Sequence, residues 1–130
     1  MTYLLNSPDN FADEAVRGLV ASHPELLVEV PGGVARSTQT PEGGQPALVI
    51  GGGSGHYPAF AGWVGPGMGH GGAPCGNIFS SPSASEVYSV VRNAENGGGV
   101  ILASETTPET SCTSGWPRRS FAMKESTSAS

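Results

Sequence analysis

The stretch Ala47-Leu48-Val49-Ile50-Gly51-Gly52-Gly53-Ser54-Gly55-His56 decides the fold of this chain. Its first four residues form a continuous apolar run of strand length, which is typical of a β-strand covered on both faces. The glycines that follow can adopt positive φ and let a ligand approach main-chain N–H groups closely. Because open α/β sheets bind ligands beyond the carboxyl ends of their strands, the stretch predicts a binding loop at the end of a buried strand.

The segments around this stretch complete a βαβ pattern. Residues 9–22 carry apolar side chains at helical spacing and are followed by His23-Pro24, so we expect a helix that ends there. Residues 26–30 suit a short strand. A second helix is predicted to begin at Ser83 or Ser85, with inward-facing residues Val87, Val90, Val91 and Ala94.

The glycines of residues 96–99 are expected to end that second helix, and Val100-Ile101-Leu102 to begin the next strand. Residues 62–76 are rich in glycine and are expected to form a loop. A strand, a glycine loop, a helix and a further strand favour the α/β class with a parallel sheet.

Composition excludes several classes of function. The chain has 130 residues, a net charge of -5 and no basic stretch longer than Arg118-Arg119, which argues against a nucleic-acid or anionic-membrane partner. No apolar run approaches the length of a transmembrane helix, and residues 1–10 lack the basic start of a signal peptide. Cys75 and Cys112 match no metal spacing. We therefore expect a cytoplasmic protein of one domain at most.

The glycine loop alone supports a binding site. It lacks the Lys-Ser/Thr ending of a P-loop and the glycine spacing of a dinucleotide fold, so a bare structural turn remains an alternative. His56 favours a functional reading, because an imidazole beside such a loop is suited to proton transfer near neutral pH. His70 is interpreted as an exposed spacer, and Phe60 and Trp63 as core residues.

Four ordered landmarks resemble the substrate-binding domain of dihydroxyacetone kinases, the DhaK type. They begin with Ile50 to Pro58 and continue with Gly62-Trp63-Val64-Gly65 and Gly67-Met68. Residues 75–83, which read CGNIFSSPS, and residues 97–102, which read GGGVIL, follow in the family's order. His23-Pro24 and Arg36 also fall where the family has them. The resemblance covers residues 1–103 and identifies the amino-terminal part of a larger DhaK-like domain.

The resemblance implies a site and a reaction, in which a terminal hydroxyl of dihydroxyacetone or a similar short ketose is phosphorylated. Gly53, Ser54 and Gly55 would contact the ketose, and His56 would also bind it and act as the acid/base for the hydroxyl. The phosphoryl donor, ATP with Mg²⁺ or a phosphohistidine carrier, would be held by a separate domain or subunit, and the intact family member would be a homodimer. Tyr57 stands where many members have Glu, which favours ATP-dependent, erythrulose-like relatives.

The resemblance also shows what this chain lacks. The family has a lysine and an aspartate after the next strand, and a later histidine that holds the ketone covalently. None of them is present, so the chain by itself is predicted to be inactive. Two alternatives stay open: a non-catalytic ketose-binding or regulatory module, and a phosphate- or nucleotide-binding α/β fragment.

Residues 104–130 differ in character from the rest of the chain. They contain no Val, Ile or Leu, and 12 of these 27 residues are Ser or Thr, so we expect disorder. Synonymous codons for residues 103–117 can be chosen so that the frame one base earlier encodes Gly-Phe-Gly-Asn-Tyr-Ala-Gly-Asp, which contains the family's missing turn. Continuing to residue 130 permits an amphipathic helix and the start of a strand. Our hypothesis is a one-base deletion near codons 102 and 103, and the alternative is a native flexible tail.

Overall fold

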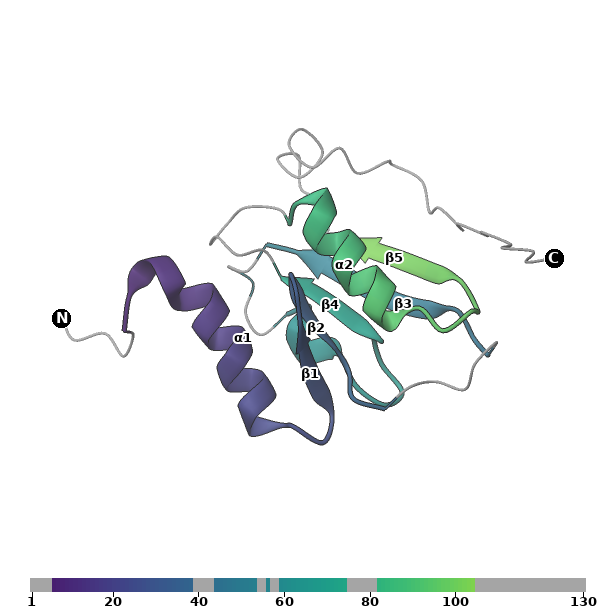
Figure 1. Ribbon diagram of the computed structural model, residues 1–130, viewed down its shortest axis with the longest axis horizontal. Coiled ribbons are helices and arrows are strands. Elements are labelled where there is room, and N and C mark those ends of the chain that lie inside the picture. The colour runs from purple at the N-terminus through teal and green to yellow at the C-terminus, as the bar shows by residue number, and fades with distance from the viewer. Residues whose placement is uncertain (1–5, 39–43, 54–55, 57–58, 75–81, 105–130) are drawn as a thin grey trace.

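A computed structural model describes residues 6–38, 44–53, 56, 59–74 and 82–104. Two α-helices, two 3-10 helices and five strands lie in these ranges (Figure 1). In chain order the elements are η1 Pro8–Asn10, α1 Phe11–Ser22, β1 Leu27–Val30, β2 Gly33–Arg36, β3 Ala47–Gly52, η3 Ala61–Trp63, β4 Gly71–Pro74, α2 Ala84–Ala94 and β5 Val100–Ser104.

The five strands form one mixed sheet in the order β1-β2-β4-β3-β5. β3 lies between β4 and β5 and is parallel to both, with Val49 opposite Gly71 on one side and Leu102 on the other. β1, β2 and β4 pair in antiparallel fashion. The predicted α/β class and the parallel strands around the glycine loop are confirmed, and an antiparallel hairpin extends the sheet beyond them.

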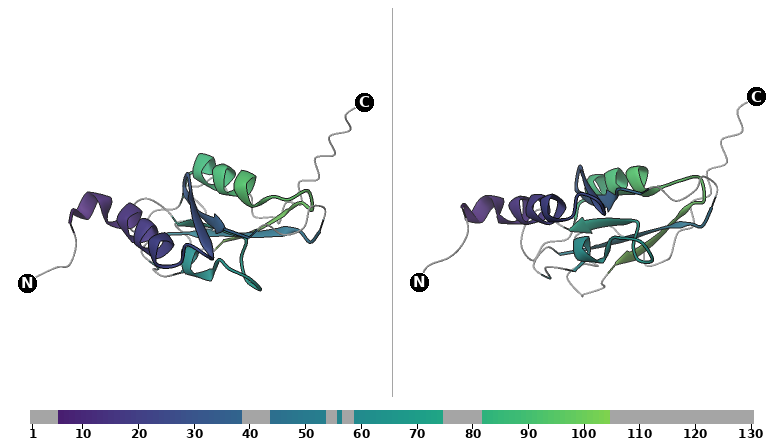
Figure 2. Two further views of the ribbon diagram at one scale, coloured as in Figure 1. Left: turned by 60° about the horizontal axis from the view of Figure 1, so that its bottom comes forward. Right: turned by 90° about the horizontal axis from the view of Figure 1, so that it is seen from below.

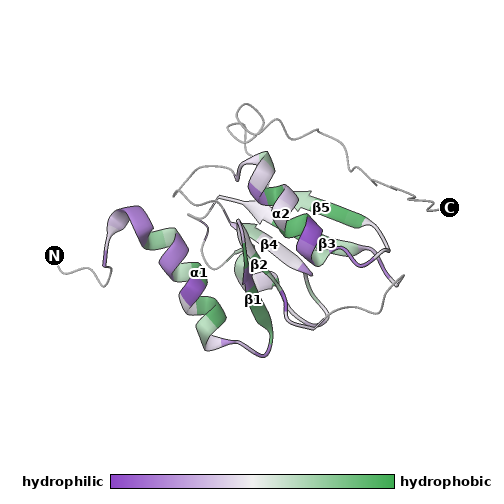
Figure 3. Ribbon diagram, viewed as in Figure 1, coloured by the Kyte–Doolittle hydropathy of each residue, from purple (hydrophilic) through white to green (hydrophobic). Residues whose placement is uncertain are grey.

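The two faces of the sheet carry separate cores. α2 packs on one face, where Val87, Val90 and Ala94 meet Val49 of β3. On the other face, α1 and η3 pack around Leu27, Val34, Ala61 and Val64. Figure 2 shows α2 and η3 on opposite sides of the sheet, and Figure 3 shows that apolar and polar residues alternate along α1. The second core therefore lies beside β1, β2 and β4, and Leu48 and Ile50 of β3 are only half-buried.

The second helix begins where the serine residues predicted it would. The Ser83 hydroxyl accepts a hydrogen bond from the Glu86 backbone N–H, and the Glu86 carboxylate accepts one from the Ser83 N–H at 2.6 Å. This reciprocal capping box satisfies two donors that a helix start otherwise leaves unpaired. At the other end, Gly97 and Gly99 have positive φ and lead the chain into β5.

The expectation of a loop over residues 62–76 is wrong in one part, because β4, Gly71–Pro74, is a buried strand inside that range. Its glycines are required by close packing rather than by turns. A Cβ on Gly71 would lie 2.7 Å from Val90 of α2, and one on Gly72 would lie 2.7 Å from the Phe60 carbonyl oxygen. Helix and loop thus approach the two faces of β4 too closely for side chains.

The amino-terminal hairpin also differs in detail from the sequence pattern. The strand expected over residues 26–30 is present as β1, but Leu27 and Val30 are buried, whereas Leu26 and Val28 are exposed. β2, which the pattern did not predict, pairs with β1 across a turn in which Gly32 has a φ of 86°. Among the described residues, no helix is long and apolar enough to cross a membrane.

Candidate functional site

The carboxyl ends of the three parallel strands meet at one edge of the sheet. Gly52 of β3 is paired with Pro74 of β4, and Gly51 with Ser104 of β5. The chain leaves β3 toward η3 on one face and reaches α2 on the other face after β4. Connections that diverge to opposite faces open a crevice at the strand ends, which is where open α/β sheets bind ligands.

The glycine loop turns back on itself directly beyond β3. The Gly53 carbonyl accepts a hydrogen bond from the His56 N–H at 3.2 Å, and the His56 carbonyl accepts one from the Ala59 N–H at 2.8 Å. Gly53 is half-buried and His56 is exposed, so the imidazole lies at the surface of this edge. The other two predicted ligand residues, Ser54 and Gly55, lie outside the described residues.

Phe60 lies beneath the loop in an unusual backbone conformation. Its φ is 66° and its ψ -69°, and the Ala61 N–H donates to the Ala59 carbonyl at 3.0 Å. These values define a γ-turn of the positive-φ type, which is rare and strained. In the described part of the chain, Phe60 is the one non-glycine residue with positive φ. Its side chain is nevertheless 3% exposed, so tight packing holds the strained turn.

The Phe60 ring contacts three parts of the site. It lies against Gly52, where an added Cβ would be 2.1 Å from the ring carbon Cζ. Its centroid is 6.2 Å from that of the His56 imidazole, with the two planes at 85°. Its second aromatic neighbour is Trp63, at 5.8 Å and 66°. The core role expected for Phe60 is confirmed, but Trp63 is 46% exposed and is not a core residue.

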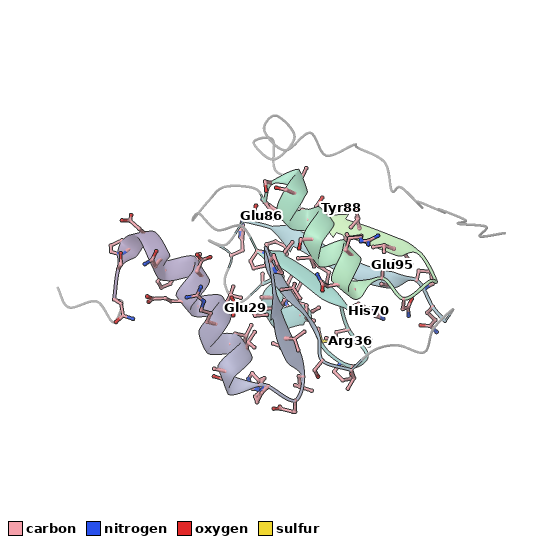
Figure 4. The ribbon with its side chains drawn as sticks, in the orientation of Figure 1. Glu29, Arg36, His70, Glu86, Tyr88 and Glu95 are labelled. Carbon is pink, nitrogen blue, oxygen red and sulfur yellow. The ribbon has the colours of Figure 1, made fainter. Side chains whose placement is uncertain are left out.

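His70 is not the exposed spacer that the sequence suggested. The ring nitrogen Nδ1 of His70 accepts a hydrogen bond from the Leu48 N–H at 3.1 Å. The backbone N–H of His70 donates to the Leu48 carbonyl at 2.7 Å. Burial, and secondly the positive charge of Arg36, lower the pKa of His70 below its ordinary value of 6.5. Figure 4 shows Arg36 and His70 close together in the molecule. The neutral ring thus has a structural role at the amino ends of β3 and β4.

A cavity of about 440 Å³ lies away from the glycine loop, between α1, the β1–β2 turn and the start of α2. It is lined by Ala12, Asp13, Val16, Arg17, Glu29, Val30, Pro31, Gly32, Gly33, Pro74 and Glu86. Arg17 and Glu29 form an exposed ion pair of 3.5 Å, and the Glu86 carboxylate already caps α2. Apart from Asp13, the charged residues on the cavity wall therefore already have partners within the fold, and the strand-end loop remains the better candidate site.

A model of one protein family matches most of the chain. The Dak1 domain aligns with residues 17–106, a range that includes the glycine loop, α2 and β5. The chain belongs to the Dak1 domain family. In the described part of the chain, no group of three or more His, Cys, Asp or Glu side chains could hold a metal ion.

Curated relatives of this Dak1 chain include an erythrulose kinase and a subunit of a dihydroxyacetone kinase. It is 90% identical over 102 residues to an L-erythrulose 1-kinase of Mycolicibacterium smegmatis, a match covering 78% of this chain and 18% of that protein. It is 40% identical over 99 residues to the dihydroxyacetone-binding subunit DhaK of a PTS-dependent dihydroxyacetone kinase of Lactococcus lactis, covering 76% and 30%. The Dak1 chain thus spans less than a third of these relatives.

Solved structures show the same fold. The dihydroxyacetone kinase from C. freundii, in complex with AMP-PNP and Mg²⁺, superimposes with a TM-score of 0.70 at 24% identity, over 84% of this chain and 21% of that one. A structure from work on the regulation of the dha operon of Lactococcus lactis gives 0.70 at 25% identity, over 83% and 33%. The sheet and helices of this Dak1 chain are therefore one portion of a larger fold.

Proposed function

We propose that the chain carries the amino-terminal half of a ketose-binding site, and that its ligand is L-erythrulose or a similar short ketose such as dihydroxyacetone. The observation that carries this proposal is the position of Gly53 and His56 at the carboxyl end of the central strand β3. Small polar ligands bind at this edge of α/β sheets, and glycines let a ligand approach main-chain N–H groups, which suit the oxygens of a ketose. The printed activities of the relatives support this ligand class.

In the intact protein, His56 would act as the acid/base of a phosphoryl transfer. The bond between the ketose hydroxyl oxygen and phosphorus forms as the bond from phosphorus to the donor breaks, which is a phosphorus–oxygen bond in ATP and a phosphorus–nitrogen bond in a phosphohistidine, and the hydroxyl proton passes to the imidazole. Positioning and charge stabilisation supply most of the catalysis in such reactions. The exposed position of His56 leaves its ring accessible to a ketose resting on the loop.

The donor and the remaining partners belong to other parts of the assembly. ATP with Mg²⁺, or a phosphohistidine carrier, would be held by a separate domain or subunit, and the whole protein would be a cytoplasmic homodimer. The complex of the C. freundii kinase with AMP-PNP and Mg²⁺ supports the first donor, and the PTS-dependent relatives support the second. The chain itself is expected to bind no metal or nucleotide.

Ketose binding by the purified 130-residue chain tests the proposal. L-erythrulose is titrated into ¹⁵N-labelled protein, and we expect the amide signals of Gly53 and His56 to shift in a saturable manner. A His56→Gln variant should weaken binding, whereas His23→Gln, at an exposed site in the α1–β1 connection, should not. Shifts confined to other regions, or equal effects of the two variants, would contradict the assignment.

A second candidate function is a ketose-binding module without kinase activity. It is favoured by the sequence itself, which contains the glycine loop and one acid/base but lacks the lysine, aspartate and later histidine that the family resemblance requires. A phosphorylation assay with a donor subunit tests the inactivity that both functions imply for this chain. We expect no product from this chain, and detectable ketose phosphate would refute its predicted inactivity.

We also propose that residues 104–130 are translated out of frame, while residues 1–103 carry the domain. Three curated kinases match 102 residues each, with identities of 90%, 60% and 52%, and each match covers 78% of this chain. Sequencing the gene across codons 95 to 130 tests this proposal. An additional base near codon 102 would place the error in the reported sequence, and a confirmed frame with the rest of the domain encoded downstream would place the deletion in the gene; both support a frame shift. A confirmed frame with no family-like sequence downstream would refute it.

A further inference from the structure

We infer that Phe60 is a positioning residue that holds the imidazole of His56 in one orientation beyond the glycine loop. This inference rests on the proposed role of His56 as the acid/base. Phe60 itself is not assigned a contact with the ligand. It acts through the histidine ring, which lies edge-to-face against it at a centroid distance of 6.2 Å.

The Phe60 ring is itself fixed on several sides. Ring carbons Cζ, Cε2 and Cε1 would lie 2.1, 2.4 and 2.8 Å from a Cβ on Gly52, so the ring occupies the space that a side chain there would need. Trp63 packs against it at 5.8 Å. The backbone of Phe60 also packs closely, because a Cβ added to Gly72 would be 2.7 Å from the Phe60 carbonyl oxygen. The ring is therefore held between β3, β4 and η3.

The strained turn gives the second independent observation. A φ of 66° at a bulky residue costs free energy, and such residues persist where the surrounding structure over-determines them. The γ-turn points the Phe60 side chain back under β3, three residues before Trp63 and four after His56. Rotation of the backbone to a relaxed conformation would withdraw the ring from both Gly52 and His56.

Loss of the contact with Phe60 would let the exposed side chain of His56 populate more χ1 rotamers. A phosphoryl acceptor needs its base within hydrogen-bond reach of the hydroxyl, so rotamer averaging lowers the fraction of productive complexes. Edge-to-face aromatic pairs are strong enough to change a rotamer ratio by about 2-fold to 10-fold. The Phe60 ring therefore selects the orientation of His56 before the ketose arrives.

Nuclear magnetic resonance on the full 130-residue chain tests this inference. Three-bond couplings from the His56 Cγ report its χ1 rotamers, and a nuclear Overhauser effect between the two rings reports their contact. We compare the unmodified chain with Phe60→Leu and with Phe11→Leu, a matched change at a half-exposed residue of α1. We expect one dominant rotamer and a ring–ring signal in the unmodified chain. Phe60→Leu should lower the rotamer ratio by about 2-fold to 10-fold, and Phe11→Leu should leave it unchanged.

Unchanged His56 couplings in a folded Phe60→Leu variant would overturn the inference, because a purely structural phenylalanine would alter stability alone. If that variant does not fold, the measurements on the unmodified chain test the inference. Averaged His56 couplings or a missing ring–ring signal overturn it. A single His56 rotamer with a ring–ring signal to Phe60 supports it. L-erythrulose is then added to the unmodified chain. An absence of ketose-induced shifts contradicts the proposed function while the coupling result stands.

Discussion

Replacing Gly52 by alanine should destabilise the fold and disturb the candidate site together. The new Cβ would lie 2.1 Å from Cζ of Phe60, whereas carbon atoms pack at about 3.5–4.0 Å, so the ring must move by roughly 1.5 Å. The ring is 3% exposed and its backbone is already strained, which leaves it little room to move. Overpacking of this kind costs about 1–3 kcal/mol, and we expect the upper half of that range.

Urea unfolding followed by far-ultraviolet circular dichroism measures this effect. A loss of about 2 kcal/mol lowers the urea midpoint by about 1 M for a chain of this size. Gly18→Ala in α1 is the matched control, since nothing lies within 4 Å of its added Cβ. A glycine in a helix interior is less favourable than alanine by about 1 kcal/mol, so the control should be stabilised. A Gly52→Ala variant as stable as the unmodified chain would show that the Phe60 ring is not fixed under β3, and would refute this packing argument.

Further predictions concern the parts of the fold that hold the site in place. Because burial lowers the pKa of His70, the folded chain favours the neutral ring. The contribution of His70 to the free energy of unfolding should therefore be fully present above pH 6.5 and decrease as the pH falls below that value. Thermal melts of the unmodified chain and of His70→Gln across pH 5 to 8 should show a shallower dependence in the variant, and parallel curves would contradict this role. Ser83→Ala removes the hydroxyl that accepts the Glu86 N–H and should cost about 1 kcal/mol in urea unfolding. Ser89→Ala, in the middle of α2 and outside the capping box, is its control and should cost less than half as much.

Elements with strong local signals were predictable from sequence. α2 has a capping serine at position 83, a glutamate three residues later and glycines after its last turn, and each of these signals acts within one turn of helix. The apolar run of β3 and the glycines after it predicted a central strand with a loop at its carboxyl end. His56 directly follows the glycine loop in the sequence, which predicts that it lies at this loop. The hydrogen bond from its N–H to the Gly53 carbonyl agrees with that position.

Elements whose cause is tertiary packing could not be predicted in the same way. β4 contains two glycines because α2 approaches Gly71 on one face and the Phe60 backbone approaches Gly72 on the other. Neither contact produces a local sequence pattern near residues 71–74, so the glycine-rich stretch predicts a loop. His70 was misjudged for a related reason, since its partner, the Leu48 N–H, is 22 residues away in the chain.

The three glycines that follow the apolar run of β3 do not share one purpose. Gly51 is still inside the sheet and pairs with Ser104 of β5. Gly52 is required because the Phe60 ring fills the space beside it, which is a packing constraint. Gly53 is the first residue beyond the strand, and its carbonyl receives the His56 N–H. Alanine at position 52 should therefore act through stability and the orientation of His56, whereas alanine at position 53 should act on the ligand loop. A glycine run of this kind supports ligand binding only at the residues that extend past the last strand pair.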